Sequence, residues 1–301
     1  MCGIVGIYSK SSSCAEQLGS HAAGMLEQMA DRGPDSAGMA IYREPVGEGE
    51  AKLSLRAVEP GPDWGGISAA LDEGLGLASF EEIGDAYGRA DVRSEPAVAA
   101  AWVDANLPAL EVVSAGRTIE IFKDAVEPSA FLSEFGIASM SGTHALGHTR
   151  MATESRVTPA GSHPFWTGLD LCLVHNGSLS NHNRLRAELE REGTVFRTKN
   201  DSEVAAGYLT WRLAAGDSLE TALEGCLEDH DGFYTFAVGT AEGFAVLRDP
   251  IACKPAVLAE TDEWVAMASE YRALATLPGG RDAEVWEPEP GVVYSWGRVA
   301  V

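Results

Sequence analysis

Hydrophobic residues recur along this chain in two patterns, and each pattern predicts one kind of secondary structure. The first is the three- and four-residue spacing of a helix that buries one face. An apolar stripe with this spacing is formed by Leu18, Ala22, Met25, Leu26 and Met29. Helices are also predicted over 181–192, 201–215 and 218–229, and Asn181 is a suitable N-cap for the first of these.

The second pattern is a short apolar run rich in β-branched residues, which predicts a strand. Such runs lie at 3–8, 36–43, 51–59, 143–149, 170–175, 233–238, 244–248, 255–259, 264–268 and 292–296. Many short strands with helices grouped before and after them predict two packed sheets covered by layers of helices. The expected fold class is therefore α+β.

The segment from about 60 to 135 has a different texture. Glycine-rich, acidic and alanine-rich helical stretches surround two strand-like runs at 111–114 and 118–122. Ala115-Gly116-Arg117 lies between these runs and predicts a hairpin. We interpret the whole segment as an inserted lobe.

Composition and charge narrow the class of partner. The chain has 301 residues, of which 45% are apolar, and this is enough for a proper core. Its formal net charge is −23, from 45 acidic residues against 22 Lys and Arg, and it has no long basic run. Nucleic acids and anionic membrane surfaces bind clustered positive charge, so neither is an expected partner. We find no signal region and no apolar run approaching the ~18–20 residues of a membrane span.

Four of the five cysteines are scattered along the chain. Cys14, Cys172, Cys226 and Cys253 form no CxxC pair and no paired Cys/His spacing. We therefore expect neither a disulfide framework nor a zinc site, and a reducing cytoplasm is the expected compartment.

Cys2 differs, because it directly follows the initiator methionine. Removal of that methionine would leave a thiol and a free α-amine on one residue, which supplies a nucleophile and a base together. Such an amine has a reference pKa of about 7.7–8.0 and can relay a proton near neutral pH. The alternative is that Cys2 is a small hydrophobic residue at the start of a buried strand.

Two polar clusters contain an arginine. Arg32 opens a turn that runs through Gly33 and Pro34, where backbone can approach another segment closely; the alternative is an ordinary solvated turn. Arg150 ends a predicted strand, and its rigid fork suits the carboxylate of a free amino acid. The alternative there is a surface arginine at a strand end.

Two further clusters contain a side-chain amide and a carboxylate. The amide of Asn176 and the N–H of Gly177 could converge on one developing oxyanion; the alternative is a simple Asn-Gly turn. Asp201 stands at the front of a predicted helix, where it could hold a substrate ammonium or act as the N-cap.

Together these clusters resemble the motifs of the class II glutamine amidotransferases, which are N-terminal-nucleophile enzymes. The matching segments, in order, are Cys2-Gly3-Ile4-Val5-Gly6-Ile7, Arg32-Gly33-Pro34-Asp35-Ser36 with Gly38, Gly147-His148-Thr149-Arg150, His175-Asn176-Gly177 and Asn200-Asp201-Ser202-Glu203. The later segments Arg248-Asp249-Pro250, Lys254-Pro255 and Ala268-Ser269-Glu270 are similar to the family's closing strands. The resemblance spans nearly the whole chain apart from 60–135.

This resemblance implies one amidotransferase domain over 1–301, folded as a four-layer αββα sandwich, which hydrolyses the side-chain amide of glutamine to glutamate and ammonia. It implies catalytic roles for Cys2 as nucleophile and for Asn176 and Gly177 as oxyanion donors. It also implies substrate-binding roles for Arg150 at the α-carboxylate, Asp201 at the α-ammonium, Arg32 in the loop around the nucleophile, and Thr153. No metal and no cofactor is implied for this chain.

The sequence departs from the family pattern at Met151, where many relatives carry an aromatic residue, and we assign no role to His163. Among relatives, the chain is most similar to the small subunit of N-methylglutamate synthase and related glutamate-synthase-like assemblies. The resemblance then implies hetero-oligomeric partner subunits that accept the ammonia, with any FMN or iron–sulfur cluster in those subunits. Two alternatives stay open: a regulatory subunit that binds glutamine or glutamate with little hydrolysis, and γ-glutamyl transfer to methylamine instead of water.

Overall fold

The computed structural model describes residues 2–151, 157–168 and 170–297, and the strands within these ranges form three antiparallel sheets. The largest has the order β15 (Glu284–Trp286), β13 (Val257–Glu260), β14 (Trp264–Ala268), β1 (Gly3–Ser9), β8 (His144–Arg150), β2 (Ser36–Tyr42) and β7 (Ile119–Asp124). The second has the order β16 (Val293–Gly297), β12 (Gly243–Arg248), β11 (Gly232–Thr240), β10 (Leu171–Leu179) and β9 (Phe165–Gly168).

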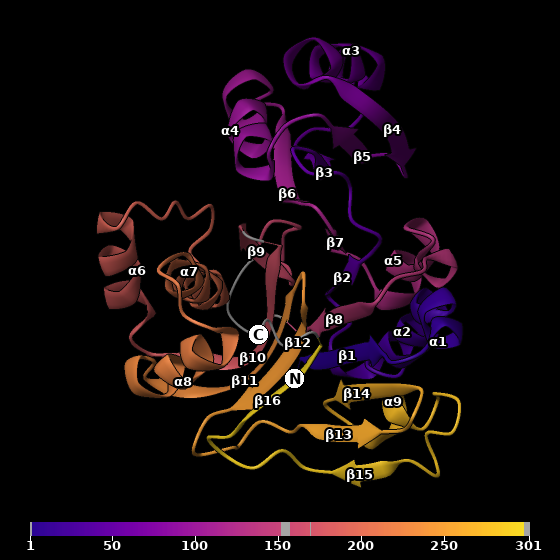
Figure 1. The fold of residues 1–301 in the computed structure, drawn as a ribbon, viewed down its shortest axis with the longest axis vertical. Helices are drawn as coiled ribbons and strands as arrows, with labels where there is room; N and C mark the ends of the chain where they lie inside the picture. Colours follow the sequence, from indigo (N-terminus) through magenta and orange to yellow (C-terminus); the bar gives the residue numbers. More distant parts are fainter. Residues whose placement is uncertain (1, 152–156, 169, 298–301) are drawn as a thin grey trace.

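These two sheets face each other and carry helices on their outer faces (Figure 1). The seven-stranded sheet is covered by α1 (Ser12–Glu16), α2 (Leu18–Glu27), α5 (Pro128–Glu134) and α9 (Tyr271–Leu274), with the short 3₁₀ turns η1 (Ala30–Arg32) and η2 (Ile137–Ser139) beside them. The five-stranded sheet is covered by α6 (His182–Arg191), α7 (Asp201–Ala214) and α8 (Leu219–Asp229). The arrangement is the four-layer αββα sandwich that the sequence predicted. Within the described ranges, every helix is too short or too polar to cross a membrane.

Strand β10 shows why the middle of this sandwich is stable. Leu171 and Leu173 pack in the core under helices α6–α8, whereas Cys172 and Val174 pack in the core between the two sheets. Alternate residues of a strand point to opposite faces, so one apolar run fills both cores. The strand is therefore buried on both sides just before it reaches the polar segment at 175–178.

A third sheet lies apart from the sandwich, at the top of Figure 1. Its order is β4 (Leu77–Ile83), β5 (Tyr87–Val92), β3 (Ala51–Ala57) and β6 (Leu110–Gly116), and it carries α3 (Trp64–Leu75) and α4 (Pro96–Asn106) over a hydrophobic core of its own. The predicted hairpin across 115–117 is wrong, because β6 and β7 join different sheets. The division of the chain into one domain with a lobe at about 60–135 stays a prediction.

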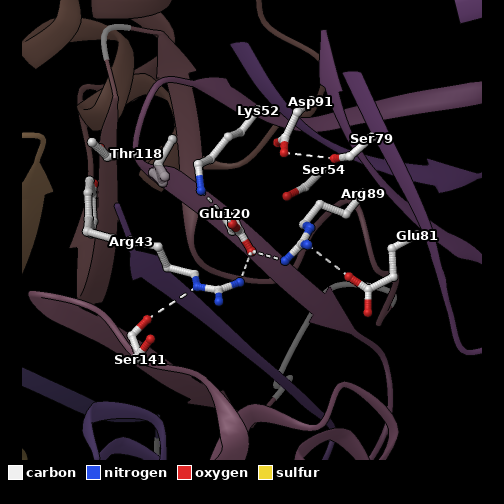
Figure 2. A network of polar contacts seen from close by, with 12 residues as sticks. Arg43, Lys52, Ser54, Ser79, Glu81, Arg89, Asp91, Thr118, Glu120 and Ser141 are labelled. Carbon is white, nitrogen blue, oxygen red and sulfur yellow. Dashed lines mark hydrogen bonds and ion pairs between the residues drawn. The ribbon is translucent and has the colours of Figure 1, made fainter. Parts of the chain in front are cut away.

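One buried carboxylate ties the third sheet to the sandwich. Glu120 on β7 is 1% exposed, and its Oε1 lies 3.1 Å from Lys52 Nζ on β3. Its Oε2 lies 3.3 Å from Arg43 Nη1 and 3.4 Å from Arg89 Nη1 on β5. Figure 2 shows the carboxylate among these three cations. Because Glu120 lies on the seven-stranded sheet whereas Lys52 and Arg89 lie on the third sheet, the carboxylate holds the two sheets together.

Candidate active site

Cys2 immediately precedes β1, and two side chains hold its backbone. Arg32 Nε donates to the Cys2 carbonyl oxygen over 3.0 Å, and Asn176 Nδ2 donates to the same oxygen over 3.2 Å. Arg32 follows α2 on the side of the seven-stranded sheet, whereas Asn176 lies on β10 of the five-stranded sheet. The position of Cys2 is therefore determined by both sheets.

Arg32 is itself held in place by Glu270. Its Nη1 lies 2.6 Å from Glu270 Oε1, and the arginine side chain is 10% exposed. The following turn lies against the end of β8, since a Cβ on Gly33 would come within 2.5 Å of the Arg150 backbone nitrogen. This is the close backbone approach expected of that glycine.

Arg150 is the last residue of β8, at the predicted strand end. Gly3 pairs with Thr149 at the end of the ladder between β1 and β8, and Cys2 and Arg150 are the next residues along the two chains. Arg150 Nη1 donates to the carbonyl oxygen of Gly161 over 3.1 Å. The predicted substrate residue Thr153 lies outside the described residues.

Asn176 and Gly177 lie inside β10, so the alternative of a simple Asn-Gly turn is wrong. Gly177 has a φ of +154°, and a Cβ there would lie 2.0 Å from the Phe233 carbonyl oxygen. Both features require glycine at this position. The amide of Gly177 has a defined direction, because alternate N–H groups of a strand point to the same edge.

The backbone N–H groups two residues before and two residues after Gly177 show which way this edge of β10 faces. The N–H of His175 donates to His163 Nδ1 over 3.3 Å, and the N–H of Leu179 donates to Asp201 Oδ2 over 2.9 Å. The N–H of Gly177 points to this edge between them. The N–H of Gly177 therefore points to the side of β10 on which Asp201 lies.

Asp201 is the first residue of α7 and not its N-cap. The N-cap is Asn200, whose side chain accepts from the Ser202 N–H over 2.8 Å. The N-cap reading of Asp201 is therefore wrong. Its carboxylate instead faces β10, with Oδ1 4.0 Å from His175 Nδ1 and Oδ2 on the Leu179 amide.

Sequence reasoning assigned no role to three buried histidines that lie at or next to β10, close to Asn176 and Asp201. The rings of His148 and His163 stack with centroids 4.0 Å apart, and His148 Nε2 lies 3.1 Å from the His175 carbonyl oxygen. Burial lowers the pKa of His148 to about 3 and also lowers the pKa of His163 and of His175. All three rings are therefore neutral at physiological pH. The available signal in the sequence was that His148 and His175 stand within two of the matched segments, next to predicted site residues.

The described part of the site holds a thiol-bearing residue and no cluster of metal-ligating side chains. Within residues 2–151, 157–168 and 170–297, no three His, Cys, Asp or Glu side chains are placed to hold a metal ion. The Asn176 amide holds the carbonyl oxygen of the half-buried Cys2, and Arg150 ends the strand next to β1. The site therefore brings together a cysteine, a side-chain amide and an arginine, which are residue types that nucleophilic catalysis with oxyanion stabilisation uses.

Comparisons with known proteins agree with this arrangement. The family model described as "Glutamine amidotransferase domain" matches residues 148–276. The glutamine amidotransferase-like protein GlxB of Rhizobium meliloti is 50% identical over 306 residues, with 98% of each chain covered. A protein of Methanothermobacter thermautotrophicus, provisionally named a glutamine amidotransferase, is 32% identical over 98% of this chain and 99% of its own length.

A solved structure shares the fold. The glutamine phosphoribosylpyrophosphate amidotransferase of B. subtilis superposes with a TM-score of 0.62 at 19% identity, covering 98% of this chain and 47% of that one. With half of all residues identical to GlxB along nearly its full length, the chain belongs to the glutamine amidotransferase family.

Proposed function

We propose that this protein is a class II glutaminase subunit that hydrolyses the side-chain amide of glutamine with Cys2 as nucleophile. The observation that carries the proposal is the double hydrogen bond to the Cys2 carbonyl oxygen, from Arg32 and from Asn176. It fixes the residue that bears the thiol beside the amide that would stabilise the oxyanion.

The proposed reaction needs only groups of this chain and water. After removal of Met1, the α-amine of Cys2 accepts the thiol proton while the sulfur attacks the amide carbon of glutamine. The tetrahedral oxyanion is stabilised by the N–H of Gly177 and the second N–H of Asn176, and one such donor is worth about 3–4 kcal/mol. The protonated α-amine gives its proton to the leaving ammonia. Water then hydrolyses the thioester to glutamate and restores the thiol.

Arg150 and Asp201 would select the substrate. A free amino acid carries a carboxylate and an ammonium on one carbon, so it needs a cation and an anion at a set separation. Arg150 would bind the carboxylate through two parallel hydrogen bonds, with Thr153 assisting, and Asp201 would bind the ammonium. The side chain of Asp201 is 23% exposed, which leaves part of it accessible to a ligand.

The nitrogen is proposed to pass to a partner subunit. Ammonia released into water is diluted and lost, so a coupled acceptor is chemically economical. We propose a glutamate-synthase-like assembly of the N-methylglutamate synthase kind, in which partner subunits carry FMN and iron–sulfur groups. Co-purification from the native cell tests this point. Recovery of the chain alone, with a glutaminase rate indifferent to a co-expressed synthase subunit, would refute the partnership.

The reaction is tested by comparing two cysteines. Cys2→Ala should abolish glutamate formation and labelling by a glutamine-like electrophile, whereas Cys253→Ala, which removes an exposed thiol outside the proposed site, should leave both unchanged. One residue inserted before Cys2 should act like Cys2→Ala, because it removes the free amine from the thiol-bearing residue. Retained hydrolysis in Cys2→Ala would overturn the mechanism. Glutamine binding by the wild-type protein without glutamate formation would favour the regulatory alternative.

A further inference from the structure

Three buried side chains form a hydrogen-bonded chain behind the proposed glutamine site. His163 lies just before β9, His175 lies on β10, and Ser202 is the second residue of α7. Ser202 Oγ is 3.3 Å from His163 Nε2 and 2.9 Å from His175 Nδ1. The three residues are 5%, 3% and 2% exposed in the order His163, His175 and Ser202, so water does not compete for these bonds.

Backbone partners determine which ring nitrogen of His163 carries the proton. Its Nδ1 faces the N–H of His175, and a backbone N–H can only donate, so Nδ1 is unprotonated. The neutral ring therefore carries its proton on Nε2, which donates to Ser202 Oγ. His163 acts as an acceptor from β10 and as a donor to α7 at the same time.

The Ser202 hydroxyl links His163 to His175. Its oxygen has two lone pairs and one hydrogen, so it can accept from His163 Nε2 and still either donate to His175 Nδ1 over 2.9 Å or accept from it and donate to Asp201 Oδ1 over 3.4 Å. In the described structure His175 Nε2 is buried without a hydrogen-bond partner, so a proton on that atom would be left unpaired. His148, like His163, is protonated on Nε2, since this atom faces the His175 carbonyl oxygen, which can only accept. Backbone partners therefore determine the proton positions of both His148 and His163.

This chain connects the two elements that carry the proposed catalytic and substrate-binding groups. His175 directly precedes Asn176 and Gly177, and Ser202 directly follows Asp201. We propose that the Ser202 hydroxyl, oriented by His163, is a positioning group that sets the start of α7 against β10, and thereby Asp201 against the oxyanion donors. The expected effect on catalysis rests on the proposed glutaminase function. The assigned proton positions do not depend on that function.

Matched variants on the same helix test the positioning role. Ser202→Ala removes the hydroxyl but keeps the backbone N–H that donates to Asn200. Thr210→Ala is the control, because Thr210 is also on α7 and its hydroxyl also bonds a neighbouring element, Thr167 on β9, over 2.6 Å. Ser202→Thr retains a hydroxyl and serves as the rescue.

We expect Ser202→Ala to lower kcat/KM for glutamine about 10- to 100-fold, since small misplacements of reacting groups have effects of this size. Both KM and kcat should change, because Asp201 and the oxyanion donors lose their common support. Thr210→Ala should stay within about twofold of wild type, and Ser202→Thr should recover most of the loss. A wild-type kcat/KM in Ser202→Ala, or an equal loss in Thr210→Ala, would overturn the positioning role.

The proton positions provide a readout that does not require catalysis. Long-range ¹H–¹⁵N spectra of the wild-type protein distinguish protonated from unprotonated ring nitrogens, and we expect Nε2–H on His148 and His163. Finding His163 protonated on Nδ1 would overturn the proposal even if Ser202→Ala failed to fold. If Cys2→Ala kept its glutaminase activity while these proton positions were observed, the proposed mechanism would fail separately from the hydrogen-bonded chain.

Discussion

The side-chain amide of Asn176 donates to the carbonyl oxygen of Cys2 over 3.2 Å, although the two residues are 174 positions apart in the sequence. This bond joins β10 of one sheet to the start of β1 in the other. An amide nitrogen carries two hydrogens, so one can hold Cys2 while the second serves a bound substrate. The bond therefore combines a structural role with the proposed catalytic one.

Asn176→Ala should lower kcat for glutamine hydrolysis by about 10²–10³, as expected for the loss of one oxyanion donor. KM should change much less, because the reacting oxygen and not the amino-acid end loses its partner. Asn181→Ala is the control, since that amide also bonds backbone atoms, at Asp229 and Asp231, but lies outside the proposed site. Steady-state kinetics measures both, and an equal effect in the two variants would contradict the assignment.

Arg150→Lys should lower kcat/KM for glutamine about 10- to 100-fold. An ammonium cannot reproduce the two parallel hydrogen bonds of a guanidinium, and bonds to charged groups are worth about 1.5–3 kcal/mol. The same change at the exposed Arg191 on α6 should have no effect. The comparison uses glutamine and a glutamine analogue that lacks the α-carboxylate. If Arg150→Lys discriminated between them as strongly as wild type, the carboxylate assignment would be wrong.

Gly177→Ala should destabilise the protein by more than Gly193→Ala does. Both glycines have positive φ, at +154° and +93°, where an L side chain costs roughly 1–2 kcal/mol. Only at Gly177 does the new Cβ also collide with backbone, since the space within 4 Å of Gly193 is open in the described structure. Denaturant unfolding of the two variants separates the steric cost from the conformational one. Equal losses of unfolding free energy in the two variants would mean that β10 and β11 move apart to accommodate the new Cβ at no energetic cost.

Acid should destabilise the protein below pH 6.5 through its buried histidines. Burial lowers the pKa of His144 to about 3, whereas an unfolded histidine titrates near 6.5. Between these values the unfolded chain binds the proton and the folded chain does not, so stability falls as pH falls through this window. At pH 5 this one residue accounts for a loss of about 2 kcal/mol. Urea unfolding at pH 7.5 and pH 5 should show a correspondingly smaller loss in His144→Asn, and an unchanged loss would contradict the prediction.

Glu120→Gln should destabilise the protein by about 3–5 kcal/mol. The change leaves Lys52, Arg43 and Arg89 without the buried carboxylate they share. Glu188→Gln is the control, because its pair with Arg184 is exposed on both sides and should contribute at most about 1 kcal/mol. Limited proteolysis should cut the Glu120→Gln protein first near the junction of the third sheet. A loss no larger than that of Glu188→Gln would show that the cations find other partners.

Most secondary-structure elements and the order of the site segments could be predicted from the sequence. The stripe from Leu18 to Met29 and the run at the end of which Arg150 lies are local patterns, and their periodicity alone determines helix or strand. The strands β4, β5, β9 and β15 were missed. β4 is largely exposed, β9 and β15 are short, and in β5 polar or small residues alternate with the apolar ones, so none of the four has an apolar run. The motif resemblance added the αββα layering, since it carries information about pairing that periodicity lacks.

The tertiary structure determined the strand pairings and hydrogen bonds that join residues far apart in the sequence. Runs 111–114 and 118–122 have hairpin spacing, yet they pair with β3 and β2, because each strand buries its apolar face in a different core. Asn176-Gly177 continues β10 because β11 pairs with it. Asn200 caps α7 by accepting from the Ser202 N–H, while Asp201 accepts from the Leu179 N–H. His163 acquired a role only when three elements met around Ser202. The sequence by itself determined local periodicity and chemistry, whereas strand partners and hydrogen-bond directions follow from packing between residues far apart in the chain.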